Sequence, residues 1–160
     1  MPLLFNLRHL EERNLVLKGD LPVSDLDVDG VDELIHVRQP LSYDLEAEKH
    51  EQAALVQGAL RVTLHCECAR CLKGFPRPLA LEHWACHIPL AGEEKAAVVN
   101  DCVDLTPYIR EDILLAFPQR PLCEPECRGL AGPEQDMKAG GAPASEAALS
   151  AWAELNKLKF

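Results

Sequence analysis

Two neighbouring stretches of the chain alternate regularly between apolar and polar residues. Over 41–48 the apolar positions are Leu41, Tyr43, Leu45 and Ala47, and over 60–67 they are Leu60, Val62, Leu64 and Cys66. A period of two residues is typical of a β-strand with one buried face. Because the charged stretch 49–52 is a turn candidate between them, we expect an antiparallel hairpin. Gly58 indicates a bulge or a local twist near the start of the second strand.

A third strand is predicted over 79–90, after a loop that ends at Phe75-Pro-Arg-Pro-Leu79. Its alternation changes phase between Leu81 and Trp84, which a β-bulge would explain. Residues 3–10 and 15–21 are shorter strand candidates. The acidic stretch 25–33 is interrupted by Gly30 and receives no assignment.

The periodicity becomes helical after Asp104. Thr106 and Pro107 suit an N-cap and a first turn. The apolar residues that follow at helical spacing are Ile109, Ile113, Ala116 and Phe117, and prolines at 118 and 121 end the helix.

These patterns predict an α+β fold, in which a mainly antiparallel β-sheet carries a packed helix and a zinc-knuckle-like cysteine site. Residues 1–130 are expected to form a single α+β domain that contains both cysteine pairs. Residues 131–144, rich in glycine and proline, predict a flexible linker. Residues 145–160 predict a short C-terminal helix, capped by Ser145 and with Trp152 and Leu155 on one stripe.

Composition limits the classes of function. The chain has 160 residues and a net charge of −10, with 16 basic and 26 acidic side chains. This balance argues against binding that depends on neutralising many phosphates across the whole surface and against a polybasic membrane contact, although a local basic patch remains compatible with it. No stretch approaches the ~18 apolar residues of a membrane span, and the first residues lack a secretory signal pattern. We therefore expect a cytoplasmic protein with no membrane partner.

Four of the seven cysteines form two close pairs. Cys68 and Cys71 are separated by two residues at the end of a predicted strand, and Cys123 and Cys127 by three residues in a proline-bounded turn. Structural zinc takes four ligands, commonly from two such pairs. The 51 residues between the pairs exceed the roughly 15–20 of an ordinary zinc ribbon. An intervening strand and helix that fold back would bring the pairs together, and we predict that the four cysteines bind zinc.

Two other interpretations of the cysteines stay open. They are compatible with reduced, partly buried thiols, which hydrophobic cores accommodate well. They are also compatible with a thiol-disulfide oxidoreductase that uses Cys68 and Cys71. Such enzymes place the first cysteine at a helix N-terminus within a βαβ unit, whereas this pair follows a predicted strand.

The remaining side chains give no catalytic pattern. Cys66 and Cys86 share the apolar phase of their predicted strands, so we expect them in the core, and Cys102 stands alone. The sequence has no nucleotide-binding glycine loop, no nucleophile elbow and no H-E-x-x-H motif. We predict that the protein is not an enzyme and has no small-molecule substrate.

The basic residues near the two cysteine pairs are a candidate phosphate-binding surface. They are Arg70, Lys73, Arg77, Arg120 and Arg128. If zinc joins the pairs, these five cations converge on one small region of an acidic protein and could contact RNA. The alternative is that they neutralise the site, because four thiolates with Zn²⁺ carry a formal charge of −2.

Two ordered blocks of sequence resemble the YceD-like large ribosomal RNA subunit accumulation protein family. The first runs from Leu64 through Cys-Glu-Cys-Ala-Arg-Cys to Leu72, with Phe75 and Pro78-Leu79 after it. The second contains Asp104-Leu-Thr-Pro, Ile113-Leu-Leu-Ala-Phe-Pro, Pro121-Leu-Cys and Cys127-Arg-Gly-Leu. The terminal Trp152-Ala-Glu-Leu155 resembles that family's closing helix. The resemblance implies a bacterial or plastid factor without established catalytic activity that large-subunit ribosomal RNA needs in order to accumulate.

The chain departs from the family at Ala131, where many relatives have a further cysteine, and no cysteine follows Cys127. This leaves one candidate set of four ligands. The leading hypothesis is a zinc-stabilised ribosome-biogenesis factor that binds large-subunit ribosomal RNA or a large-subunit ribosomal protein. The alternatives are a protein–protein adaptor without RNA contact, whose acidic surface would attract basic ribosomal proteins, and the oxidoreductase.

Overall fold

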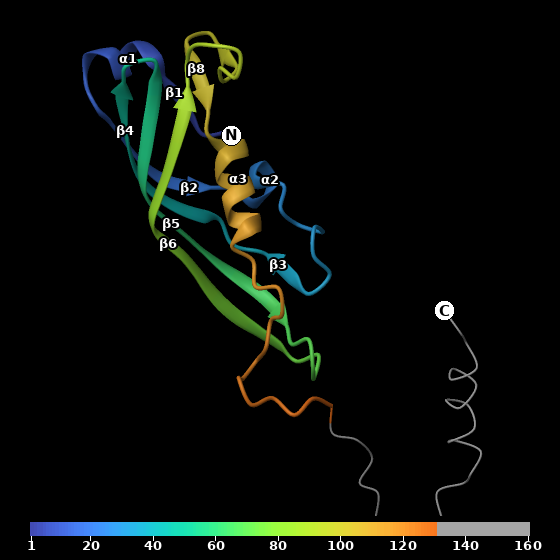
Figure 1. Ribbon diagram of the computed structural model, residues 1–160. Coiled ribbons are helices and arrows are strands. Elements are labelled where there is room, and N and C mark those ends of the chain that lie inside the picture. The colour runs from blue at the N-terminus through green and yellow to red at the C-terminus, as the bar shows by residue number, and fades with distance from the viewer. Residues whose placement is uncertain (131–160) are drawn as a thin grey trace, which may run out of the picture. The chain divides into compact units, whose positions relative to one another are not determined.

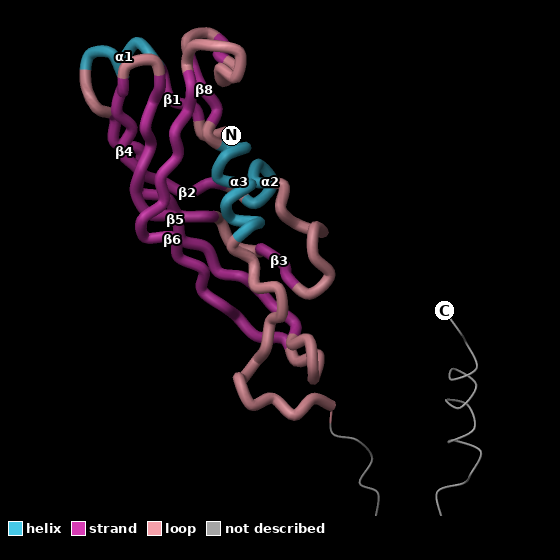
Figure 2. Tube along the Cα trace, in the orientation of Figure 1, coloured by secondary structure: helices cyan, strands magenta, loops and turns pink. Residues whose placement is uncertain are grey.

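A five-stranded antiparallel sheet forms the body of the described chain (Figures 1 and 2). The structure is a computed structural model that describes residues 1–130, so the predicted linker at 131–144 and the predicted helix at 145–160 lie outside the described residues. The strand order is β2-β4-β5-β3, and β6 pairs with the other side of β5. The strands are β2 (Leu15–Leu21), β3 (Ile35–Val37), β4 (Leu41–His50), β5 (Ala53–Glu67) and β6 (Gly74–Pro89).

A smaller sheet and three helices complete residues 1–130. The sheet has the order β1-β8-β7, with β1 at Leu4–Asn6, β7 at Val98–Val99 and β8 at Cys102–Asp104. The helices are α1 (Leu7–Glu12), α2 (Val23–Leu26) and α3 (Thr106–Leu115). Figure 1 shows α2 and α3 side by side next to the large sheet, and the two helices are in contact. The mainly antiparallel α+β fold predicted from the sequence is confirmed.

The predicted hairpin is confirmed as β4 and β5, whose paired residues run from Ser42 opposite Arg61 to His50 opposite Ala53. The alternation marks the buried face correctly. The core residues that β4 and β5 contribute are Leu41, Leu45, Ala47, Ala54, Val56, Leu60, Val62, Leu64 and Cys66. Helix α3 adds Ile109 and Ile113 to this core. Trp84 of β6 donates from Nε1 to Oδ2 of Asp112 at 2.6 Å and so joins the sheet to α3.

The predicted bulge lies between β5 and β6. Gly58 pairs with Trp84, but Leu60 pairs with Leu81, so two residues of β6 lie opposite one residue of β5. This arrangement accounts for the change of phase between Leu81 and Trp84. Gly58 has φ +149°, and a Cβ there would lie 2.1 Å from the carbonyl oxygen of Asp44 on β4. Only glycine fits this position without displacing the neighbouring strand.

Several local predictions were wrong or incomplete. The loop expected over 75–79 is part of β6, because these residues pair with β5. The strand predicted over 3–10 ends at Asn6, because the side chain of Asn6 accepts a hydrogen bond from Arg8 N at 2.9 Å and starts α1. Thr106 is not an N-cap. Its hydroxyl instead accepts from Leu3 N at 2.9 Å, and Asp104 Oδ1 accepts from Thr106 N at 2.8 Å. The short strand β3, for which no strand was predicted, pairs with β5.

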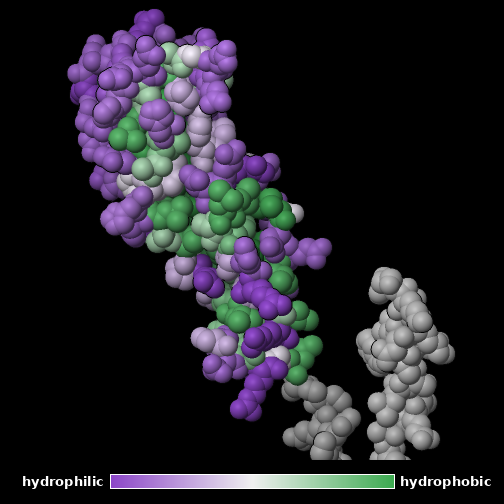
Figure 3. Space-filling model, viewed as in Figure 1, coloured by the Kyte–Doolittle hydropathy of each residue, from purple (hydrophilic) through white to green (hydrophobic). Residues whose placement is uncertain are grey.

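The hydropathy of the surface changes from one part of the described residues to another. Figure 3 shows polar residues over the end that carries α1 and hydrophobic residues gathered where α2 and α3 lie. None of the helices within residues 1–130 combines the length and the apolar character that a membrane span requires.

Candidate metal centre

The two cysteine pairs meet at the end of the β5–β6 hairpin. Cys68 and Cys71 lie in the turn between these strands, and Cys123 and Cys127 lie in the segment that follows α3. Figure 1 shows this segment passing beside the β5–β6 turn. Ala69 N donates to the Pro121 carbonyl at 2.8 Å and ties the two segments together. The fold-back predicted from the long spacing is therefore present.

The β5–β6 turn brings Cys68 and Cys71 toward the same point. Cys68 N donates to the Lys73 carbonyl at 2.9 Å, and Leu72 N donates to the Cys68 carbonyl at 2.9 Å. Leu72 has φ +61°, a left-handed conformation that is uncommon for a residue with a side chain. The turn that results places the two thiols of this pair within 4.8 Å of each other.

The second pair is held by a turn of its own and by Arg70. Cys127 N donates to the Glu124 carbonyl at 3.1 Å. Nη1 of Arg70, which lies between the first two cysteines, donates to the Cys127 carbonyl at 2.7 Å. Gly129 follows with φ +90°, and a Cβ placed on it would lie 3.5 Å from the Arg70 carbonyl oxygen. Arg70 thus connects the two pairs.

The four sulfur atoms have the spacing of a tetrahedral metal site. Sγ of Cys68 lies 3.7 Å from Sγ of Cys127, and Sγ of Cys71 lies 3.6 Å from Sγ of Cys123. All four sulfurs lie within 4.8 Å of one another. Tetrahedral zinc with Zn–S bonds of ~2.3 Å would set the sulfurs ~3.8 Å apart. Cys68 is buried and the other three are half-buried. The donor set and its spacing fit a metal ion.

The thiols of the cluster have shifted pKa values that favour a bound cation. Backbone N–H groups of Cys123 and Cys71 lower the pKa of Cys68 to about 6. Hydrogen bonds with the Cys71 side chain and burial raise the pKa of Cys123 to about 12. Without a cation, ionisation of one thiol therefore opposes ionisation of its neighbours. A divalent ion that binds all four sulfurs would remove this conflict and release the remaining protons.

The five predicted RNA-binding residues are all exposed and belong to the two segments that meet at the cysteines. Only Arg70 has an internal role there, through its bond to the Cys127 carbonyl. No pattern in the sequence indicated this role, because an arginine between two cysteines carries no positional signature. Within residues 1–130, the side chains of the other four form no hydrogen bond or ion pair with the protein.

The other cysteines lie apart from the site. Cys66 is buried in the core, as its strand phase predicts. Cys86 is half-buried against the core, and burial, with a smaller effect of Asp112, raises its pKa to about 11. Cys102 of β8 accepts a hydrogen bond from Asn6 Nδ2 at 3.7 Å.

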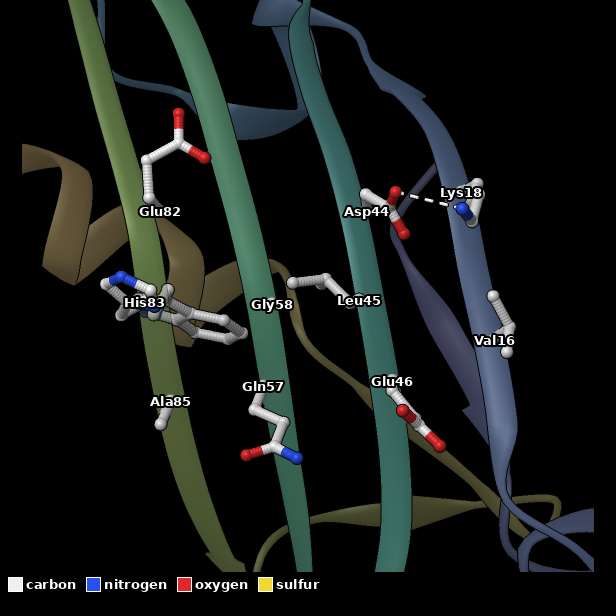
Figure 4. A pocket seen from close by; sticks show the side chains of 11 residues that line it. Val16, Lys18, Asp44, Leu45, Glu46, Gln57, Gly58, Glu82, His83 and Ala85 are labelled. Carbon is white, nitrogen blue, oxygen red and sulfur yellow. Dashed lines mark hydrogen bonds and ion pairs between the residues drawn. The ribbon is translucent and has the colours of Figure 1, made fainter.

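A shallow hollow of about 530 Å³ on the large sheet provides no second chemical site (Figure 4). Its three carboxylates all have partners. Asp44 accepts from Lys18 Nζ at 2.9 Å, and Glu46 accepts from Asn14 Nδ2 at 3.2 Å. Glu82 accepts two hydrogen bonds from Arg61, at 3.0 and 2.7 Å.

The chain matches the model of one protein family. The model of the family "Large ribosomal RNA subunit accumulation protein YceD" matches residues 56–159, which include all four cysteines of the site. An uncharacterized protein of Mycobacterium bovis is 32% identical over 108 residues, which cover 61% of this chain and 52% of that protein. Uncharacterized proteins of two Mycobacterium tuberculosis strains match to the same extent. The chain thus spans about half the length of these relatives. No solved structure matches it.

Proposed function

The chain belongs to the YceD family of large ribosomal RNA subunit accumulation proteins, and we propose that it is a non-enzymatic, cytoplasmic ribosome-biogenesis factor that binds large-subunit ribosomal RNA. The observation that supports this proposal is the number of exposed basic residues in the two segments that carry the four cysteines. Residues 66–79 and 118–130 carry five basic and three acidic side chains, whereas the whole chain has 16 basic and 26 acidic ones. These side chains sum to +2, which the −2 of four thiolates with Zn²⁺ offsets, so the metal-loaded region is formally neutral in a chain of net charge −10.

Zinc is the metal that best suits this site. Four thiolates from Cys68, Cys71, Cys123 and Cys127 would hold the ion, as in structural sites that lack an open coordination position. Bound zinc supplies a link between the β5–β6 turn and the segment after α3. That link keeps the cations at 73 and 77 beside those at 120 and 128. Zinc thus supports the surface and takes no part in a reaction.

Phosphate contact accounts for four of the exposed cations better than neutralisation of the site does. Arg70 already serves the cysteine cluster by donating to the Cys127 carbonyl. Lys73, Arg77, Arg120 and Arg128 extend from the surface without a partner among residues 1–130. Exposed lysines and arginines without an acidic partner are typical of backbone contacts to nucleic acid, which set affinity and its dependence on salt.

The test compares two triple variants. The first replaces Lys73, Arg77 and Arg128 by glutamine. The control replaces Arg13, Arg38 and Lys95, which are also exposed, and so changes the net charge equally. We expect crosslinking and sequencing to recover large-subunit ribosomal RNA with the wild type and the control. The first variant should bind more weakly, and its log–log salt slope should be smaller by about 2, at roughly 0.7 per phosphate contact to a single strand. Failure to enrich ribosomal RNA, or equal weakening in both variants, contradicts RNA binding at this surface.

A protein partner is the second candidate, because the rest of the chain is strongly acidic. Outside the two segments named above, 11 basic side chains face 23 acidic ones. Such a surface would attract basic ribosomal proteins. Pull-down after nuclease treatment separates the two: a ribosomal protein retained without RNA supports an adaptor.

Thiol-disulfide exchange is the weakest candidate. The YceD family is not a known enzyme family. The lowered pKa of Cys68 is compatible with a reactive thiol, but backbone N–H donors also stabilise thiolates that bind zinc. If the purified protein carries a Cys68–Cys71 disulfide and no metal, the zinc proposal is wrong and the exchange activity gains support.

A further inference from the structure

A second surface lies between the small sheet and α3. A cavity of about 760 Å³ is bounded by β1, β7 and β8 on one side and by the start of α3 on the other. This volume falls within the roughly 300–1,000 Å³ of ligand-binding pockets. Within residues 1–130, Figure 1 shows β1 and β8 at one end of the fold and the β5–β6 turn at the other. The cavity therefore shares no residue with the cysteine cluster or the basic residues near it.

The cavity is apolar within and has exposed apolar side chains at its mouth. Ala96 and Val103 are buried in its wall, and Tyr108 contributes a half-buried ring. Leu4 and Val99, which also line it, are 49% and 67% exposed. Large apolar side chains left open around a concave apolar site are typical of an interaction surface.

Among the described residues, the only charged groups that line the cavity are carboxylates. They belong to Asp104 at the end of β8 and to Glu111 on α3. Neither forms an ion pair within residues 1–130. Arg110, the basic residue of α3, instead donates to the Asp27 carbonyl at 3.0 Å. An occupant that leaves both carboxylates desolvated would bind poorly, and a phosphate would be repelled.

Strand β7 also presents an unpaired edge beside the cavity. It pairs with β8 on one side and, within residues 1–130, with nothing on the other. Val98 and Val99 are 43% and 67% exposed there. Free backbone N–H and C=O groups at such an edge can bind an extended peptide as an added strand.

We propose that this cavity binds a basic peptide segment, which inserts apolar side chains between β7 and α3 and places lysines or arginines against Asp104 and Glu111. Charge complementarity identifies the occupant. A neutral apolar molecule would leave the two carboxylates unpaired, and RNA would meet them with like charge. The inference does not depend on RNA binding at the cysteine cluster, and each can fail without the other.

The test uses the full chain and a fluorescein-labelled peptide in which leucine alternates with lysine, with binding followed by anisotropy. Replacing the leucines by serine should weaken binding about tenfold or more. Replacing the lysines by serine while keeping the leucines should weaken it to a similar extent. Equal binding of the peptide without lysine overturns the proposal in favour of a neutral apolar ligand.

Variants of the protein locate the site. Asp104→Asn with Glu111→Gln should weaken peptide binding at least fivefold, roughly the loss of one charge-assisted contact. The amide oxygen of the new asparagine can still accept from Thr106 N, so the start of α3 is retained. The control, Asp20→Asn with Glu33→Gln, removes the same charge at exposed positions outside the cavity. Equal weakening in both pairs means non-specific attraction and overturns the proposal. The Lys73, Arg77 and Arg128 variant should bind the peptide as the wild type does, which separates this test from the RNA test.

Discussion

Replacing Cys71 by serine should remove the bound zinc and the stability that it provides. Cys71 and Cys123 lie 52 positions apart in the chain and Cys68 and Cys127 lie 59 apart. Zinc joins these distant positions only in the folded chain, so its binding free energy becomes folding free energy. At about 1,000 times its dissociation constant, zinc would stabilise the folded chain by ~4.1 kcal/mol. At about 3–4 °C per kcal/mol for a domain of this size, zinc should raise the Tm by roughly 10–15 °C.

The assay combines metal analysis with thermal unfolding. The wild type should contain about one zinc ion per chain, as a site with four thiolates requires, and a chelator should lower its Tm by the amount above. Cys71→Ser should bind no zinc, and a chelator should not change its Tm. Cys102→Ser is the matched control, because Cys102 lies outside the cluster and a serine hydroxyl can still accept from Asn6. Stoichiometric zinc in Cys71→Ser, or a Tm that the chelator leaves unchanged, would refute the assignment of these ligands.

Three further predictions concern the sheet and α3. Gly58→Ala should lower the free energy of unfolding, measured by urea titration, by more than about 2 kcal/mol. The reason is that the new Cβ would lie 2.1 Å from a β4 carbonyl oxygen. Gly74→Ala is the control and should cost far less, because no atom lies within 4 Å of its Cβ. Trp84→Phe removes the 2.6 Å bond to Asp112 and should cost about 1–3 kcal/mol, and a double-mutant cycle with Asp112→Ala should show coupling. Burial raises the pKa of Cys86 from 9.0 to about 11, so folding favours the neutral thiol. Its contribution is complete below pH 9 and should be lost as the pH rises through 11, and Cys86→Ala should remove that part of the alkaline loss of stability.

The strands that the sequence predicted well are those whose alternation reports burial directly. The pattern over 41–48 and 60–67 identified β4 and β5, and even the slip at the bulge was visible as a change of phase. Strand β3 has only three residues, and its position is set by pairing with β5. Short elements of this kind depend on a partner distant in the sequence, so local patterns give little sign of them.

The cysteine pairs were visible from spacing, but their mutual approach depends on the whole fold. It requires that the segment after α3 pass beside the β5–β6 turn and that Ala69 bond to Pro121. The bond from Arg70 to the Cys127 carbonyl could not be predicted from the sequence. Nor could the position of Asp104 and Glu111 at the cavity between the small sheet and α3. Each acts on residues brought together from distant segments, and none belongs to a spaced motif.

Loss of the metal should act mainly on one end of the molecule. The segment 118–130 contains no helix or strand, and the hydrogen bonds that tie it to the β5–β6 turn include those of Ala69 and Arg70. The hairpin β4–β5, in contrast, lies in the hydrophobic core. Local stability follows such differences in packing and hydrogen bonding. Without zinc, we expect 118–130 to separate from the turn while the sheet stays folded.

Hydrogen exchange with and without a chelator tests this expectation. Amide exchange should accelerate over 68–73 and 118–130, and β4 should keep its protection. If the protein binds RNA as we propose, its RNA affinity should fall at the same time, because Arg120 and Arg128 would separate from Lys73 and Arg77. Uniform acceleration across the sheet would mean instead that zinc stabilises the whole domain rather than the joined segments. Unchanged RNA affinity after loss of the metal would mean that the basic residues do not need the cysteine cluster to bind RNA.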